Sequence, residues 1–262
     1  SIFHVIFNVT TTALLIPFTK YLVKYSCLVI KDKKATEETV TLKYVDDRLI
    51  STPPVALMQV KKEIDYMLGL VEENISLSFL AVETGSSEHD AKIRNNEKII
   101  NFTNRTLTDF LIKLSPTVEQ SDEKIIGTYF HVLNDLERIG DHAENFHEIG
   151  VEMANKKIFF SELASKEIAT MRLKIFEMFA ISKDAFENHN KAHLPTLTTL
   201  EETVDKMKKD LTASHFTRLA EGNCNTYASP YYSSLVAGLE RVADHLVNVG
   251  YSVMNPTGSQ QI

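Results

Sequence analysis

The segment that decides the fold is LERIGDHAEN at residues 136–145, because it returns almost unchanged as LERVADHLVN at residues 239–248, an offset of 103 residues. The apolar positions around the two copies recur at alternating steps of four and three. They are Val132, Leu136, Ile139, Ala143 and Phe146 in the first copy, and Leu235, Leu239, Val242, Leu246 and Val249 in the second. Such steps are those of a helix packed in a bundle, and a repeated unit predicts a duplicated architecture.

Long helices account for the chain from residue 54 to residue 254. The 262 residues include only nine Gly and seven Pro, too few for a sandwich or barrel that turns about every 8–12 residues. Helical apolar spacing between breakers predicts helices over residues 54–82, 88–114, 121–153, 161–189, 196–221 and 229–254. We therefore predict an all-α fold of two repeated three-helix bundles, at 54–153 and 161–254, with a tail at 255–262.

The informative residues lie beside the apolar stripe. Glu137 and Asp141 fall one turn apart at outward heptad positions, as do Glu240 and Asp244. Two carboxylates at this spacing repel by roughly a few tenths of a kcal/mol unless a cation lies between them. Since packing does not fix outward positions, we interpret the repeated pairs as metal ligands. The alternative is a solvated face on which Glu137 and Glu240 pair with arginines and add little stability.

Acidic residues of the second and fifth helices extend both sets. Glu201, Glu202 and Asp205 form a similar acidic face in the second half, and Glu97 with Asn101 occupies the comparable places in the first. An all-oxygen ligand set suits Fe, Mn, Mg or Ca, so the expected cofactors are divalent or ferric ions. Because Asn101 stands where the second half has a carboxylate, we predict that the first site is the weaker.

Other polar residues of the repeated decapeptide are expected around the metal ligands rather than on the metal. His142 and His245 lie at the edge of the apolar stripe, which favours a packing role or a role behind the ligands. The whole set comprises Arg138, His142 and Asn145 in the first copy, and Arg241, His245 and Asn248 in the second.

The N-terminal segment differs from the rest of the chain. No charged residue occurs between Ile2 and Thr19, and apolar residues continue to Ile30, which suffices for the roughly 20 helical residues that cross a hydrocarbon core. Lysines follow on the C-terminal side only. The positive-inside bias therefore predicts a transmembrane helix over residues 1–30 in a cell membrane, with the residues after about 30 on the cytoplasmic side.

Polar residues within this segment, such as His4 and Asn8, suit contact with sister helices better than contact with lipid. The chain offers no sister helix and begins at Ser1, so we interpret it as the C-terminal piece of a larger membrane protein. The alternative is a core helix of a soluble protein. The polar stretch 31–53 predicts a linker with a short helix around residues 44–49.

Several function classes are excluded by the composition. No GxGxxG or GxxxxGK[ST] run is present, and a net charge of −7 without a basic cluster argues against a nucleic-acid partner. Cys27 and Cys224 form no CxxC motif, which disfavours a disulfide scaffold or thiolate zinc site. A ferritin-like di-metal oxidase needs two Glu-x-x-His pairs, and the sequence offers one candidate, Glu144 with His147. We expect no enzymatic activity.

The doubled LER-[IV]-x-DH-x-x-N motif resembles the signature of PhoU domains, helical proteins built from two three-helix repeats whose E/DxxxD faces can carry metal clusters. The stretch from His215 through Arg218 and Gly222 to Cys224 is similar to the version of that domain appended to bacterial sodium/phosphate cotransporters.

The run HVIFN, which contains His4, Phe7 and Asn8, resembles the last transmembrane helix of those cotransporters, as does the following LLIPF. The resemblance implies a cytoplasmic regulatory domain that couples phosphate status to an attached transporter. Its expected partners are that transporter's transmembrane domain and the membrane, and a homodimer stays open. The Gln-Ser-rich transport motifs are absent, so this chain is not expected to transport by itself. The alternative is a free-standing PhoU-type adaptor that regulates a phosphate sensor kinase or a transporter.

Overall fold

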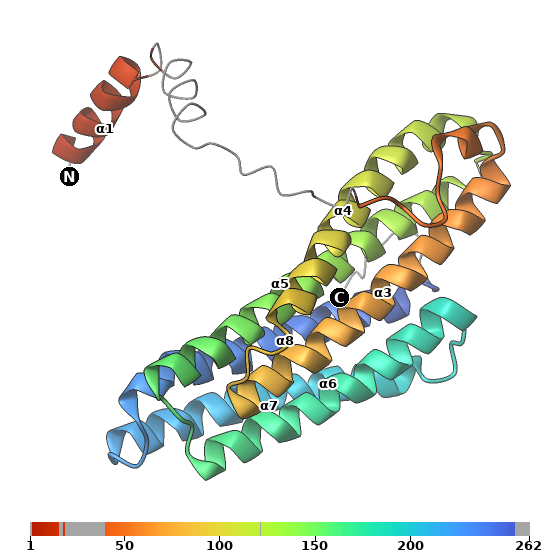
Figure 1. The fold of residues 1–262 in the computed structure, drawn as a ribbon. Coiled ribbons are helices and arrows are strands. Elements are labelled where there is room, and N and C mark those ends of the chain that lie inside the picture. The colour runs from red at the N-terminus through yellow and green to blue at the C-terminus, as the bar shows by residue number, and fades with distance from the viewer. Residues whose placement is uncertain (1, 16–17, 19–39, 121, 255–262) are drawn as a thin grey trace. The chain divides into compact units, whose positions relative to one another are not determined.

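Six long helices from α3 to α8 carry the repeated segments (Figure 1). The computed structural model describes residues 2–15, 18, 40–120 and 122–254. They belong to two units, Ser1–Val40 and Thr41–Ile262, which we describe separately. Within the described residues there is no strand, and the predicted all-α class is confirmed.

The first unit contains helix α1 (Ile2–Leu15), which has 14 residues. At about 1.5 Å rise per residue it is too short for a hydrocarbon core of about 30 Å. None of the described helices is both long and apolar enough to cross a membrane. The structure therefore does not support the predicted transmembrane helix over residues 1–30. His4, Phe7 and Asn8 lie at exposed positions of α1, and most of residues 16–30 lie outside the described part.

The helices of the second unit begin and end within a few residues of the predicted positions. They are α3 (Pro53–Thr84), α4 (Asp90–Leu114), α5 (Glu123–Lys156), α6 (Glu162–Asn188), α7 (Leu194–Ala220) and α8 (Ser229–Tyr251). Short 3-10 helices precede α3 (η2, Asp47–Ser51), follow α4 (η3, Ser115–Thr117) and precede α8 (η4, Thr226–Ala228). The short helix predicted around residues 44–49 corresponds to η2, shifted toward α3.

Local sequence explains several of these ends. Proline occupies the first turn of α3, α7 and α8, where its missing N–H costs no helical hydrogen bond. The Ser161 hydroxyl accepts a hydrogen bond from the Ala164 N–H at 3.3 Å and caps α6. Gly85 ends α3 with φ of 67°, a left-handed conformation that favours glycine. A Cβ on Gly85 would also lie 2.6 Å from the Ala154 Cβ.

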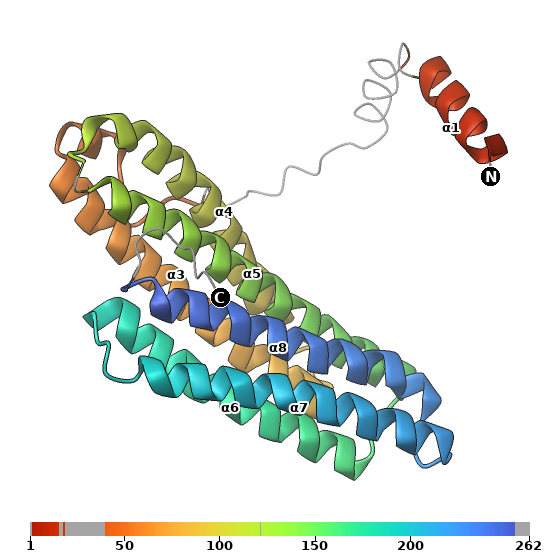
Figure 2. The ribbon, with the colours of Figure 1, turned by 180° about the vertical axis from the view of Figure 1, so that it is seen from behind.

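The two repeats pack into one core. In each repeat the first helix packs against the third, α3 on α5 and α6 on α8, and the middle helices α4 and α7 lie on the flanks. The contact of α5 with α8 joins the repeats, as both views show (Figures 1 and 2). All ten predicted stripe positions are at most 1% exposed. The predicted bundles therefore share a single core across the α5–α8 contact.

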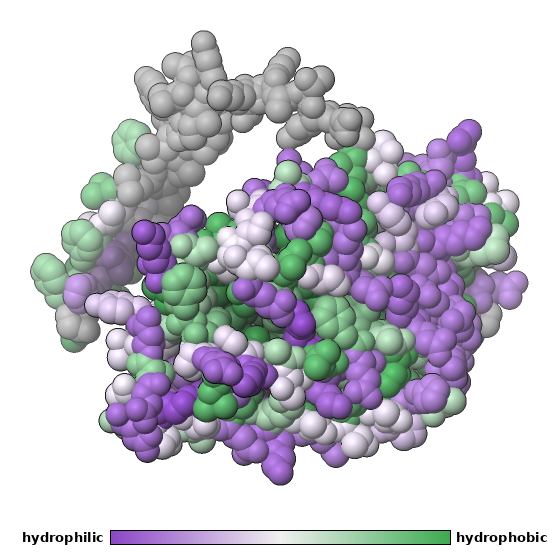
Figure 3. All heavy atoms as spheres, turned by 60° about the horizontal axis from the view of Figure 1, so that its bottom comes forward, coloured by the Kyte–Doolittle hydropathy of each residue, from purple (hydrophilic) through white to green (hydrophobic). Residues whose placement is uncertain are grey.

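Apolar side chains also reach the surface of the molecule. Figure 3 shows one face on which hydrophobic residues gather between hydrophilic ones. Leu163, Leu173 and Phe216 are each more than half exposed. Single apolar residues of this kind are ordinary on protein surfaces, so they do not by themselves define a site.

Candidate metal centres

The carboxylates of the second repeat gather between α7 and α8. Glu201 and Asp205 lie one turn apart on α7, and Asp244 reaches them from α8. Each offers an oxygen, and these oxygens all lie within 4.8 Å of one another. This is the only group of three or more His, Cys, Asp or Glu side chains so closely placed in the described part of the chain. Three oxygen ligands from two helices form a suitable partial shell for a hard cation.

The surroundings of this group disfavour its negative charge in the absence of a cation. Burial raises the pKa of Glu201, and the neighbouring Asp205 and Asp244 raise it further. Burial likewise raises the pKa of Asp244, with Glu240 and Asp205 as the next causes. A bound cation would offset this repulsion, because an opposite charge favours the ionised form of each carboxyl group.

Glu240 does not belong to this group of three. Its Oε1 accepts a hydrogen bond from the Lys208 ammonium of α7 at 2.6 Å, and its side chain is only 14% exposed. Its other oxygen is buried without a hydrogen-bond partner. The structure thus separates the predicted pair: Asp244 joins the acids of α7, whereas Glu240 pairs with a lysine. Sequence spacing gave no signal for Lys208.

In the first repeat the central acid is Glu97 of α4. Its side chain is buried, and neither carboxylate oxygen has a hydrogen-bond partner. Burial raises its pKa to about 7, and Glu144, Asp141 and Glu137 of α5 raise it further in that order, while the nearby Asn101 side chain acts to lower it. Buried charges are normally paired or bound to a metal. An unpaired buried carboxyl among three other acids therefore fits a cation site.

Sequence reasoning overlooked Glu144 as a member of the first cluster. Its counterpart in the second repeat is Val247, and the absence of a repeated acid removed the signal. Glu144 also lies 3.7 Å from the Arg94 guanidinium. The first cluster thus has its extra acid on α5, whereas the second has Asp205 on α7 in the place of Asn101.

The repeated pairs are less outward than the heptad positions predicted. The side chain of Glu137 is 24% exposed and that of Asp141 is 46% exposed, and the Arg138 guanidinium lies 3.8 Å from each. Glu202, by contrast, is an exposed residue outside the group of three. The pairs lie on the flank of the core, where α5 and α8 face the middle helices. Glu137 therefore lies near an arginine, as the solvated-face alternative predicted, but its side chain is also partly buried.

The repeated histidines meet at the contact of α5 with α8. The ring centres of His142 and His245 are 6.3 Å apart. His245 Nδ1 lies 2.8 Å from Asp135 Oδ1, and the Asn248 amide donates to the same oxygen at 3.2 Å. Burial lowers the pKa of His142, and His245 lowers it further. Both histidines lie beside the repeated acidic pairs rather than within the group of three.

The remaining predicted residues lie along the same contact. Asn145 and Arg241 are exposed, and the Arg241 guanidinium lies 3.9 Å from Glu240. His147, which the oxidase interpretation would need as a ligand, is buried and faces Asp90 at 3.1 Å. It therefore points to the start of α4 rather than to the acids around Glu97.

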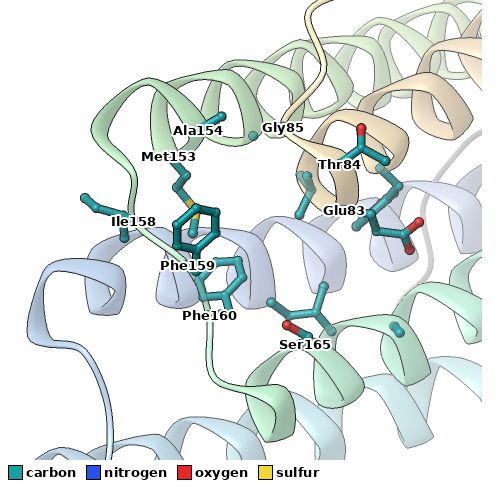
Figure 4. Close-up of a pocket in the computed structure, with 14 residues that line it drawn as sticks. Glu83, Thr84, Gly85, Met153, Ala154, Ile158, Phe159, Phe160 and Ser165 are labelled. Carbon is teal, nitrogen blue, oxygen red and sulfur yellow. The ribbon is translucent and has the colours of Figure 1, made fainter.

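A separate cavity of about 270 Å³ lies where the two repeats join. Figure 4 shows Met153, Ile158, Phe159 and Phe160 around it, with Glu83 at its far side. None of the residues predicted as ligands lines this cavity. Its walls are mainly apolar and come from the ends of α3 and α5, the connection to α6 and the start of α6. It is a feature of the junction rather than part of the acidic clusters.

Comparison with known proteins agrees with the duplicated fold. A structure titled "Crystal structure of PhoU from Pseudomonas aeruginosa" superposes with a TM-score of 0.68 at 21% identity, covering 76% of this chain and 95% of that one. The PhoU homolog 1 of Thermotoga maritima, a phosphate-specific transport system accessory protein, is 26% identical over 197 residues, 74% of this chain and 83% of the relative.

A third relative, the putative inorganic phosphate export protein YjbB of Salmonella typhimurium, is 19% identical over 258 residues. That alignment covers 96% of this chain but only 47% of the relative. The family model described as "PhoU domain" matches twice, at residues 64–149 and 168–253. The two matches contain the two acidic clusters, one each. The chain therefore belongs to the PhoU domain family.

Proposed function

We propose that this chain is an accessory or regulatory domain of phosphate transport whose two acidic clusters bind divalent or ferric ions. The observation that carries the proposal is the duplicated family match, in which each copy contains one cluster. The relative from Thermotoga maritima is a phosphate-specific transport system accessory protein. The same kind of role suits this chain, since fold and repeat order agree over most of its length.

The ligand sets support the metal-binding part of the proposal. In the second repeat, Glu201, Asp205 and Asp244 would hold the ion through carboxylate oxygens. In the first, Glu97 would do so with Asp141 and Glu137, because its unpaired buried oxygens lie among their charges. Oxygen ligands of this type suit Fe, Mn, Mg or Ca.

The expected effect of the ion is mechanical and electrostatic. Each cluster takes acids from a flanking helix and from a helix of the central α5–α8 contact. An ion would neutralise their repulsion and tie α7 to α8, and α4 to α5. Metal binding would therefore stabilise the packing of α4 and α7 against the core. Such a change would alter the surface that a transport protein contacts.

A second candidate keeps the chain attached to a transporter. The alignment with the putative phosphate export protein extends over nearly the whole chain, including most of its first 40 residues, yet spans about half of that relative. This observation favours a larger parent protein with its PhoU-like part on the cytoplasmic side of a cell membrane. Metal binding by the acidic clusters is common to both candidates.

Catalysis is not part of either candidate. The Glu144 and His147 pair of the oxidase interpretation has Val247 and Gly250 as its counterparts, and His147 faces Asp90. The proposed regulatory role requires only binding and a conformational response.

The test is phosphate uptake by source cells that lack this chain, compared with cells that express the wild type or Asp205→Asn/Asp244→Asn. The proposal predicts altered uptake in the deletion strain, restoration by the wild type and incomplete restoration by the variant. Glu162→Gln is the matched control, because its side chain is 84% exposed and far from both clusters in sequence. Unchanged uptake in the deletion strain would contradict the role in phosphate transport.

A further inference from the structure

Two sites flank the contact of α5 with α8, and the 103-residue repeat makes them counterparts. The Asp135 side chain occupies one site, which we call the filled groove, and a groove remains at the other, which we call the open groove. On one side, His245 and Asn248 of α8 face Asp135 of α5. On the other, His142 of α5 faces Gly238 of α8. Position 238 is the counterpart of position 135. The grooves thus share an imidazole and an amide but differ in one carboxylate.

The filled groove shows which chemical group the imidazole and the amide bind. Asp135 Oδ1 lies 2.8 Å from His245 Nδ1 and 3.2 Å from the Asn248 amide nitrogen. The Asp135 side chain is only 14% exposed. A carboxylate held by an imidazole and an amide at these distances forms charge-assisted hydrogen bonds. On this side of the α5–α8 contact, His245 and Asn248 therefore bind an anionic group.

The other groove lacks that anion. A Cβ on Gly238 would lie 3.7 Å from His142 Nδ1, so the same ring nitrogen faces the place where the carboxylate would begin. The ring of Phe146 lies 2.5 Å from this Cβ position, and its counterpart is the smaller Val249. An open groove of about 380 Å³ remains, lined by His142, Asn145, Ser234 and Arg241 among others.

The charges in the open groove suit an oxyanion. The Arg241 guanidinium lies 3.9 Å from Glu240, a long ion pair, and its planar fork suits oxyanions. Asp141 also lines the groove, which would repel an anion. The Arg138 guanidinium lies 3.8 Å from the Asp141 carboxylate and offsets part of this repulsion.

We propose that the open groove beside His142 and Gly238 binds a small oxyanion, outside the space that the Phe146 ring fills next to Gly238. The His142 imidazole, the Asn145 amide, the Ser234 hydroxyl and the Arg241 guanidinium are its donors. Inorganic phosphate and a free carboxylate such as acetate share this chemistry. The donors belong to the protein, so binding does not require metal in the acidic clusters.

The test uses the full chain with ¹⁵N-labelled histidine, kept metal-free with EDTA, and follows its imidazole NMR signals during titration. Inorganic phosphate and acetate are added in separate titrations at constant ionic strength. We expect a saturable shift of the His142 signal with phosphate, while the His245 signal stays in place. A tighter response to acetate than to phosphate would identify a carboxylate as the occupant and would equally support the oxyanion site.

Variants separate this groove from general charge effects. Arg241→Gln should weaken binding about tenfold or more, because a charged donor is lost. Its counterpart Arg138→Gln removes only a charge 3.8 Å from Asp141 and should weaken binding less. Gly238→Asp/Phe146→Val copies the filled groove and should abolish the His142 response. Asp135→Ala empties the filled groove and should make the His245 signal respond to the anion.

If the Gly238→Asp/Phe146→Val variant does not fold, the two arginine variants still test the proposal, because Arg241 and Arg138 are exposed. Absence of a saturable His142 shift with both anions would overturn the proposal. Equal weakening by Arg241→Gln and Arg138→Gln would also overturn it, because it would show diffuse charge attraction rather than a site. Since EDTA removes metal throughout, these outcomes are independent of the metal-binding proposal.

Discussion

The two repeats share one backbone plan but distribute their buried charges differently. In the second repeat, Glu201, Asp205 and Asp244 gather within 4.8 Å, and Lys208 neutralises the nearby Glu240. In the first, Glu97 is buried among acids without a bonded partner. Both repeats thus keep a glutamate on the flanking helix and an acid pair on the central helix, whereas Glu144 and Asp205 have no acidic counterpart in the other repeat.

A buried glutamate on the first helix of each repeat shows the same divergence. The family matches begin at Ile64 and Ile168, and each is preceded by a buried or half-buried glutamate. Glu63 accepts a hydrogen bond from the Tyr44 N–H at 2.7 Å. Glu167 instead forms a two-point ion pair with Arg218, at 2.9 and 2.8 Å. A backbone N–H of the segment before α3 binds the glutamate of the first repeat, whereas an arginine guanidinium binds the glutamate of the second.

The largest expected effect comes from removing that charge. Arg218→Leu should lower the free energy of unfolding by about 3 kcal/mol, because it leaves a mostly buried carboxylate without its cation. Glu63→Gln in the first repeat should cost only about 1 kcal/mol, the net contribution of one hydrogen bond. Urea denaturation of both variants measures the difference. Equal losses would show that the two glutamates are held equivalently.

The pH dependence of stability should differ between the clusters. The pKa of Glu97 is raised to about 7 in the folded state, so its favourable contribution is present below the ordinary pKa and is lost as pH rises through 7. The metal-free protein should lose on the order of 2 kcal/mol of stability from this residue between pH 5 and pH 8. Glu97→Gln should remove that loss.

Glu201→Gln is the matched variant of the second repeat for this experiment. The pKa of Glu201 is also raised by burial, but Glu201 is only partly buried, so its substitution should change the pH profile less. Denaturation at several pH values in EDTA compares the three proteins. A wild-type profile as flat as that of Glu97→Gln would contradict the raised pKa of Glu97.

Exchanging the residue that distinguishes the ligand sets should reverse their order of affinity. Asn101→Asp should strengthen metal binding in the first repeat, and Asp205→Asn should weaken it in the second, each by about tenfold for one charged ligand. Calorimetric titration with Mn²⁺ of each variant gives the two affinities. Unchanged affinities in both variants would exclude these positions from the sites.

The smallest expected effect concerns Lys208. Lys208→Asn introduces the residue found at position 104 of the first repeat and frees Glu240 to turn toward the neighbouring acids. Metal affinity of the second site should rise by roughly a few-fold, because Glu240, whose side chain is 14% exposed, loses its cation and adds negative charge beside the site. The same titration with Mn²⁺ measures it. A fall in affinity would show that Lys208 holds the site in its binding geometry.

Periodicity and duplication were sufficient to predict the helices and the core. The apolar steps of four and three identified ten stripe positions that are all buried, because helix packing is a local consequence of spacing. The same spacing overstated the exposure of Glu137 and Asp141. A heptad position is defined relative to one partner helix, whereas here a third helix covers the flank.

The contacts that set each cluster were not predictable in the same way. Lys208 meets Glu240 from a different helix, and Glu144 joins Glu97 without a counterpart in the second repeat. No period in the sequence marks such pairs. The 103-residue offset places Asp135 and Gly238 at equivalent positions, but it does not show that Asp135 contacts His245. The uncharged N-terminal run predicted a longer apolar helix than the 14 residues of α1.

The central claim is that the acids of the second repeat form a metal site. Its most direct test is elemental analysis of the purified wild type beside Asp205→Asn/Asp244→Asn, after both are loaded with the same metal mixture and desalted. We predict that the wild type retains a divalent or ferric ion which the variant loses, with equal helix content by circular dichroism. Equal metal content in the two proteins, or no retained metal in the wild type, would contradict the claim.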